Sequence, residues 1–214
     1  MDEIIRGEKV PANPIPERKY EQFKYKLEEK SIKYAKRNIM LFYLGVATGY
    51  RLGDICGLTI GEILEALVED KFSIQEQKQY KAWQKYIKEH PNSSRRPPKK
   101  RESPIKANLR KLLKDYCKGK SKSSYAFESN KKGEHISPKA YSNILSEVGK
   151  ELNLKNISGH SLRKTYASRL WESTRNLEYV RIALGHKSIE TTKVYLGLND
   201  EVKEGAASIA DDRL

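Results

Sequence analysis

The sequence GHSLRKTYASRL spans residues 159–170 and carries the strongest structural signal in the chain. The spacing of its apolar residues predicts a helix, and His160 and Arg163 stand three positions apart on one face of it. Arginine offers a planar fork of donors that suits two phosphate oxygens, and histidine can bond an oxygen or exchange a proton near neutral pH. The pair therefore predicts a phosphate-binding face.

A second stretch, LGHKSIETTKVYL at residues 184–196, supplies His186 and, nine residues later, Tyr195. A tyrosine hydroxyl can attack phosphorus when neighbouring cations stabilise the charge that develops. Together the two stretches contain the parts of a phosphoryl-transfer site that works without a metal. We therefore expect neither a metal nor an organic cofactor.

The charge balance favours a polyanionic partner. The 214 residues include 42 Lys and Arg against 28 Asp and Glu, which gives a formal net charge of +14. A balance this basic is typical of nucleic-acid-binding proteins. The length suffices for one substantial core, so one compact domain is expected.

Membrane and secreted classes fit the sequence poorly. The only strongly apolar run, residues 39–46, is too short to cross a bilayer, and no secretory signal opens the chain. Cys56 and Cys117 have no metal-ligand spacing around them and are interpreted as reduced thiols. We expect a cytoplasmic protein without a membrane partner.

A third motif follows a predicted buried helix. Residues 37–48 are dense in apolar side chains, as expected of a helix that is covered on most sides. The sequence TGYRLGD, residues 48–54, then ends that helix at Gly49 and presents Arg51. Asp54 stands three positions later, close enough to orient the guanidinium of Arg51 if a helix resumes.

The next segment allows two interpretations. Residues 71–77 alternate weakly, with Phe72 and Ile74 on one side, which favours a strand of a small sheet. Aromatic residues then recur at helical spacing, so Lys78 can instead begin a helix that runs to His90.

A basic loop, NSSRRPPKKR at residues 92–101, is interrupted by proline and cannot pack a core. It remains solvated or lies against a phosphate backbone. The candidate DNA-binding residues are the cations of this loop and one lysine of the first stretch: Arg95, Arg96, Lys99, Lys100, Arg101 and Lys164.

The three motifs TGYRLGD, GHSLRKTYAS and LGHKSIETTKVYL occur in the order found in the tyrosine recombinases, or phage-type integrases, and the chain resembles the catalytic domain of that family over roughly residues 14–205. Each residue alone fits ordinary packing or ion pairing, so the prediction rests on their joint occurrence. The resemblance implies an α+β fold that is mainly helical with a small antiparallel β-sheet.

The prolines at residues 11, 14 and 16, together with the resemblance, suggest how the chain is organised. We expect an irregular lead-in over residues 1–14 and a catalytic domain over residues 15–214, with a C-terminal tail from about residue 197. Many members carry a separate helical DNA-binding domain before the catalytic one, and we expect none here.

The resemblance also implies the role of each site residue. Tyr195 attacks the scissile phosphate and forms a 3′-phosphotyrosyl bond, Arg51 and Arg163 neutralise the non-bridging oxygens, and His186 bonds the phosphate. His160 helps to accept the proton of the tyrosine, and Asp54 steers Arg51.

The family uses a lysine of a strand hairpin as the general acid toward the leaving 5′ oxygen. Lys78 is the candidate here. Lys99 or Lys100 takes this role if Lys78 lies on a helix instead.

The expected function is therefore site-specific DNA recombination, with integration or excision of a mobile element as the first role. Alternatives are a catalytically silent DNA-binding regulator with the same fold and a topoisomerase-like DNA-relaxing enzyme. The implied partners are double-stranded DNA and, on that DNA, further copies in a tetramer. In isolation we expect a monomer or a weak oligomer.

Overall fold

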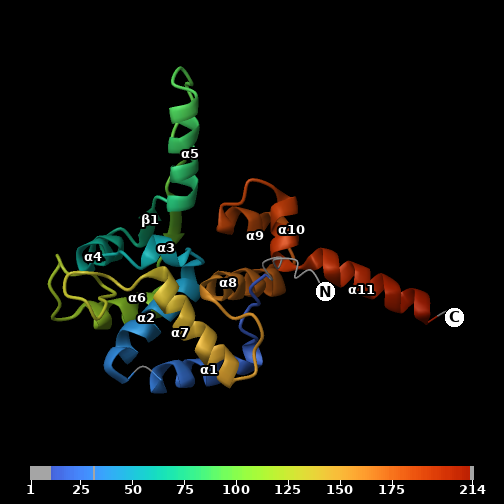
Figure 1. Cartoon of the computed structure of the whole chain (residues 1–214), viewed down its shortest axis with the longest axis horizontal. Helices are drawn as coiled ribbons and strands as arrows, with labels where there is room; N and C mark the ends of the chain where they lie inside the picture. Colours follow the sequence, from blue (N-terminus) through green and yellow to red (C-terminus); the bar gives the residue numbers. More distant parts are fainter. Residues whose placement is uncertain (1–10, 31, 213–214) are drawn as a thin grey trace, which may run out of the picture.

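The computed structural model describes residues 11–30 and 32–212 and confirms a mainly helical fold with a small antiparallel sheet (Figure 1). The helices and strands follow in this order: α1 (Glu17–Glu29), η1 (Ile32–Tyr34), α2 (Ala35–Thr48), α3 (Leu52–Ile55), α4 (Ile60–Val68), β1 (Lys71–Ile74), α5 (Gln77–Glu89), β2 (Arg101–Pro104), α6 (Ala107–Cys117), α7 (Pro138–Glu151), α8 (Gly159–Thr174), α9 (Leu177–Leu184), α10 (Ile189–Leu196) and α11 (Leu198–Asp211).

The main hydrophobic core is built around α2, the helix predicted from the apolar run. Leu41, Phe42 and Leu44 are fully buried, and α1, α6 and α8 pack around this helix. Burial of each such side chain contributes about 1.5–3 kcal/mol. Because α2 ends and α8 begins beside this core, the residues at those helix ends are held in a rigid frame.

Both interpretations of residues 71–90 are partly right. A two-stranded antiparallel sheet pairs Phe72 of β1 with Ser103 of β2, and α5 begins three residues after β1 ends. The α5 helix rises away from the rest of the molecule, and residues 90–100 return from its far end to β2 (Figure 1). The insertion between the two strands is therefore a helical arm.

The C-terminal helices form a second, smaller cluster. Ala167 of α8 packs with Val180 and Leu184 of α9, and Tyr195 and Leu196 of α10 cover this cluster. The last helix, α11, extends away from the body of the molecule (Figure 1). The tail expected from about residue 197 thus begins with a helix.

The predicted lead-in lies partly outside the described residues, since residues 1–10 are not described. Residues 11–16 have no regular secondary structure, and α1 begins at Glu17. Among the described residues, no helix has the length and apolar character needed to cross a membrane.

Candidate active site

Arg51 lies at the turn between α2 and α3. Gly49 ends α2 with φ +62°, a left-handed conformation that glycine adopts without strain. A Cβ at Gly49 would stand 2.3 Å from Cδ1 of Tyr166, so the site has no room for a larger residue. The turn leaves Arg51 as the N-cap of α3, and its Nη1 lies 2.7 Å from Oε1 of Glu76.

Arg163 is held from two directions by backbone carbonyls. It lies in α8, is 2% exposed, and donates from Nη1 to the carbonyl of Gly49 and from Nη2 to that of Leu184, each at 2.6 Å. Burial lowers the pKa of Arg163 to about 10, and the charge of Arg51 acts in the same direction. Arg163 therefore remains a cation at neutral pH, with its guanidinium plane fixed.

His160 and Lys78 line one cavity of about 440 Å³ that also reaches Arg51. His160 is the second residue of α8, where the Ser158 hydroxyl accepts a bond from its backbone N–H. Partial burial lowers the pKa of His160, and the nearby cations Arg51, Arg163 and Lys78 add to this effect. The imidazole of His160 is thus favoured in its neutral form, which can accept a proton.

Lys78 lies on a helix, in the first turn of α5, and it still borders the same cavity as Arg51 and His160. Lys100 instead lines a different cavity, together with Asp54 and Gln77, and Lys99 is exposed. The sequence favours Lys99 or Lys100 as the general acid if Lys78 lies on a helix, and Lys78 does lie on one. Of the three lysines, however, Lys78 is the one that lines the cavity with Arg51 and His160, so the geometry favours Lys78.

His186 follows the turn that ends α9. Its Nδ1 lies 3.1 Å from Oγ1 of Thr192, a fully buried residue of α10. This contact engages Nδ1 and leaves Nε2 for a ligand. Burial and the charges of Arg163 and Arg51 lower the pKa of His186 to about 4, so the ring is neutral at physiological pH.

The rings of Tyr195 and His186 pack edge to face with centroids 5.3 Å apart, and Nζ of Lys164 lies over the Tyr195 ring at 5.4 Å from its centroid. The tyrosine hydroxyl is buried and donates a hydrogen bond to no acceptor among the described residues. Burial raises the pKa of Tyr195 to about 12, while Arg163 and Arg51 act to lower it. A ligand that binds the two guanidinium groups can therefore also contact the hydroxyl of Tyr195.

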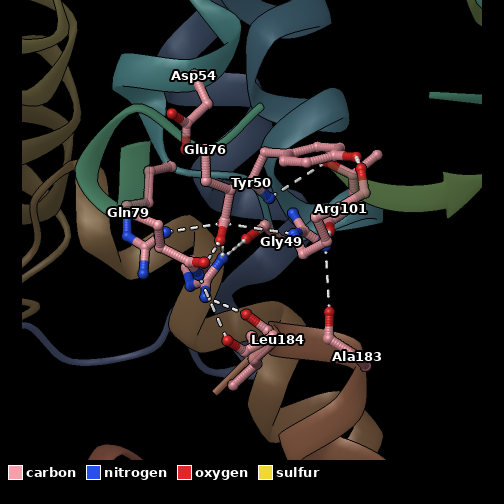
Figure 2. Close-up of polar contacts among 12 residues, drawn as sticks. Gly49, Tyr50, Asp54, Glu76, Gln79, Arg101, Ala183 and Leu184 are labelled. Atoms are coloured by element: carbon pink, nitrogen blue, oxygen red, sulfur yellow. Dashed lines mark hydrogen bonds and ion pairs between the residues drawn. The ribbon is translucent and has the colours of Figure 1, made fainter. Parts of the chain in front are cut away.

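Glu76 stands at the centre of the site, although it lies outside the three sequence motifs (Figure 2). Its side chain is 3% exposed, and its Oε1 lies 3.2 Å from Nη1 of Arg163 as well as 2.7 Å from Nη1 of Arg51. The polar string QEQK at residues 75–78 gave no sign that one of its carboxylates is buried. Glu76 is therefore the carboxylate that the structure places on Arg51.

Asp54 has a different contact from the one expected. Its Oδ1 accepts a bond from the backbone N–H of Gln77 at 2.7 Å. Asp54 thus fixes the entry to α5, and the direct ion pair of Arg51 is with Glu76.

Arg101 does not share the exposure of the other loop cations. Its side chain is 9% exposed, its Nη1 donates to the carbonyls of Thr48 and Ala183, and its guanidinium stacks 3.6 Å over the ring of Tyr50 (Figure 2). These contacts join β2 to the ends of α2 and α9. The sequence predicts that Arg101 contacts DNA, but the structure buries its guanidinium, where it connects β2 to α2 and α9.

A basic groove leads outward from the site along α5. It has a volume of about 850 Å³ and runs from Arg51 and His186 to the arm, where Arg95 and Arg96 line it. Trp83 donates from Nε1 to the carbonyl of Arg95, whose guanidinium lies 4.7 Å over the ring of Tyr86. The loop that the sequence leaves free to be solvated is thus attached to the arm.

Comparison with known proteins agrees with this architecture. The sequence profile described as the phage integrase family matches residues 15–202. The chain is 24% identical to the probable integrase/recombinase YoeC of Bacillus subtilis (strain 168), over 81% of this chain and 84% of that protein. It is 28% identical to the tyrosine recombinase XerA of Pyrococcus furiosus, over 90% of this chain and 61% of that protein.

Solved structures show the same fold at lower identity. The crystal structure of XerA recombinase superposes with a TM-score of 0.61 and 19% identity, covering 96% of this chain and 66% of that one. The Tn1549 transposon integrase in complex with a circular intermediate DNA gives a TM-score of 0.64 and 16% identity, covering 89% and 63%. XerH site-specific recombinase bound to difH substrate gives 0.60 and 20%, covering 88% and 51%.

The match covers most of the chain, and the chain spans between about half and two thirds of these three solved structures. The motifs that define the site lie inside the matched range. The protein belongs to the phage integrase family, the tyrosine recombinases, whose enzymes cleave and rejoin DNA.

Proposed function

We propose that this protein recombines DNA at specific sites through a covalent 3′-phosphotyrosine intermediate, with Tyr195 as the nucleophile. The observation that carries the proposal is the buried hydroxyl of Tyr195, which lies beside the guanidinium groups of Arg163 and Arg51 and donates to no acceptor among the described residues. A tyrosine that served only packing would more often satisfy its hydroxyl elsewhere.

The cleavage step balances with residues already in the site. The hydroxyl oxygen of Tyr195 bonds to the scissile phosphorus, the bond from phosphorus to the 5′ oxygen breaks, and the electron pair stays on that oxygen. Arg51 and Arg163 stabilise the charge on the non-bridging oxygens, and His186 bonds one of them through Nε2. Each such donor in a preorganised site lowers the barrier by roughly 3 kcal/mol.

Two protons move in this step. His160, neutral because its pKa is lowered, accepts the proton of the Tyr195 hydroxyl. Lys78, which borders the same cavity as Arg51 and His160, donates a proton to the leaving 5′ oxygen. Rejoining runs the same transfers in reverse, with a 5′ hydroxyl of either strand as the attacking group.

The groove along α5 supports a path for the DNA strand beside the scissile phosphate. Its cations are Arg51, Lys78, Lys85, Arg95, Arg96 and Lys187, against one carboxylate, Glu89. The remaining predicted contacts are the exposed Lys99 and Lys100 and the half-buried Lys164. Phosphate contacts of this kind position a duplex without reading its sequence.

Similarity also supports the wider role. One structural neighbour is the integrase of a transposon, solved with a circular intermediate DNA, which favours integration or excision of a mobile element here. We also propose that the protein acts in the cytoplasm and forms a tetramer on paired DNA sites. In that tetramer α11 would dock on a neighbouring copy, because its apolar residues Val202 and Ile209 are 69% and 64% exposed.

A suicide substrate tests the proposed function. This is a nicked duplex of the cognate site from which a short 5′-hydroxyl fragment diffuses away after cleavage, so that the intermediate accumulates. Wild type should give a covalent protein species that carries labelled DNA on a denaturing gel, and Tyr195→Phe should give none. Tyr179→Phe, at a 54% exposed position of α9, is the matched control and should behave as wild type.

The alternatives predict other results. Binding to verified cognate DNA with no covalent species in wild type would favour the silent regulator. A covalent species on any duplex, with relaxation of supercoiled DNA and no exchange of partners, would favour the topoisomerase-like enzyme.

A further inference from the structure

The phosphate-binding cations of the site already hold a carboxylate. Oε1 of Glu76 lies 2.7 Å from Nη1 of Arg51 and 3.2 Å from Nη1 of Arg163, and Nε of Arg101 approaches the same oxygen at 3.4 Å. Three guanidinium groups therefore converge on one oxygen of Glu76, whose side chain is 3% exposed. Figure 2 shows these contacts meeting at Glu76.

The second carboxylate oxygen is also held. Oε2 of Glu76 accepts a bond from Nε2 of Gln79 at 2.8 Å, on the first turn of α5. Glu76 itself is the N-cap residue of α5 and lies in the short connection after β1. The carboxylate is thus fixed by the core of the site on one side and by the base of the arm on the other.

Both N–H groups of Arg163 Nη1 already have acceptors. Nη1 serves both the carbonyl of Gly49 and Glu76, and Nη2 serves the carbonyl of Leu184. Nη1 of Arg51 and Nη1 of Arg163 both donate to Oε1 of Glu76, so a phosphate oxygen bound between these two nitrogens would take the place of that carboxylate oxygen. A carboxylate kept beside that phosphate would also repel it.

We infer that Glu76 is an internal stand-in for the scissile phosphate: it keeps Arg51 and Arg163 in place while DNA is absent, and it leaves their shared donors when the phosphate enters. The inference rests on the proposed function, because it assigns these two arginines to the phosphate. It adds that the site has an internal competitor for its substrate.

Binding of inorganic phosphate to the full chain tests this inference without any cleavage. At constant ionic strength, Glu76→Gln keeps the size and one acceptor of the side chain but removes the competing charge, so it should bind phosphate about tenfold or more tightly than wild type. Glu134→Gln removes the same charge from an exposed pair with Lys131 and should leave phosphate binding unchanged. Calorimetric titration measures both.

A second variant covers the case in which Glu76→Gln does not fold. Gln79→Ala removes the bond to Oε2 and leaves every arginine contact intact, so it should strengthen phosphate binding by a smaller factor. Phosphate binding that is unchanged or weaker in the folded variants would overturn the inference and leave Glu76 as a brace of the arginines alone.

The phosphate titration and the suicide-substrate experiment can fail independently. If the suicide substrate gives a covalent species but Glu76→Gln does not gain phosphate affinity, the recombinase proposal stands and this inference fails. If phosphate affinity rises but no covalent species forms, an internal competitor exists in a site that does not cleave.

Discussion

Arg163 illustrates how single residues define this site. Its charge is buried, which is costly, and carbonyl groups from the ends of α2 and α9 satisfy its donors. The position of the guanidinium is consequently set by three helices, and the geometry depends on the fork shape of arginine rather than on its charge alone.

Arg163→Lys should therefore nearly abolish cleavage. A lysine keeps the charge but cannot bond both carbonyls and a phosphate oxygen in one plane, so we expect the single-turnover rate of adduct formation to fall about 100- to 1000-fold. Arg169→Lys, on the same helix but paired with Glu17 at the surface, is the matched control. A loss of less than threefold in Arg163→Lys would contradict this role.

The histidines predict how cleavage depends on pH. The folded pKa of His160 lies below its usual 6.5. In the proposed mechanism, only its neutral form can accept the proton of Tyr195. The rate should therefore be insensitive to pH between about 7 and 8 and fall as the pH drops through the folded pKa of His160. His186, with a pKa of about 4, stays neutral over most of this range.

Rate measurements on the suicide substrate between pH 5 and pH 8 check this prediction. His160→Gln should be slow and should lose the acidic decline. An acidic decline that persists unchanged in His160→Gln would assign it to another group. His90→Gln, at the exposed end of α5, is the control.

The sequence allows site residues to be predicted from their type and order, but it does not reveal the contacts that depend on burial. Arg51, His160, Arg163, His186 and Tyr195 stand in three motifs that spacing makes visible, and the structure brings them together. Motif spacing does not reveal Glu76, because a glutamate in a polar segment is normally solvated. Only the fold shows that three arginines surround it.

The α5 arm is the element that the sequence specifies least. Two short strands and a helix share residues 71–104, and local patterns cannot tell where a strand of four residues ends and a helix begins. The aromatic residues that suggested a helix also hold the returning loop, because Trp83 bonds the carbonyl of Arg95 and Tyr86 lies under its guanidinium.

Neutralising the arm should weaken DNA binding mainly through electrostatics. For Arg95→Gln combined with Arg96→Gln, we expect lower affinity for every duplex tested and a decrease of about 2 in the slope of log affinity against log salt concentration. Fluorescence anisotropy at several salt concentrations measures the slope.

The control for the arm keeps the net charge equal. Lys88→Gln combined with Lys111→Gln removes two exposed lysines that do not line the groove. A slope that changes equally in the two double variants would mean that the groove has no special part in binding.

The whole molecule has a compact body from which α5 and α11 extend in different directions (Figure 1). The body was predictable, because α2 is apolar on most sides and the motif order matches one family. The directions of the two extensions were not, since they depend on packing at the helix bases rather than on local sequence.

The exposed apolar residues of α11 predict a role in assembly. Val202 and Ile209 are seven residues apart and share one face of the helix. Val202→Glu combined with Ile209→Glu should leave binding to a single DNA site intact and abolish the tetramer on paired sites, as measured by sedimentation of the protein–DNA complex.

The assembly prediction also has a control on the same helix. Ala207→Glu places a charge on a different face of α11 and should preserve the tetramer. Tetramers that survive the double substitution would show that other surfaces carry the assembly.

Mapping the trapped species tests whether Tyr195 becomes covalently bound to DNA. After digestion with nuclease and trypsin, mass spectrometry should find a nucleotide on the peptide VYLGLNDEVK, residues 194–203, whose only tyrosine is Tyr195. A nucleotide on any other peptide, or no modified peptide from protein that binds its cognate DNA, would contradict the assignment of Tyr195 as the nucleophile.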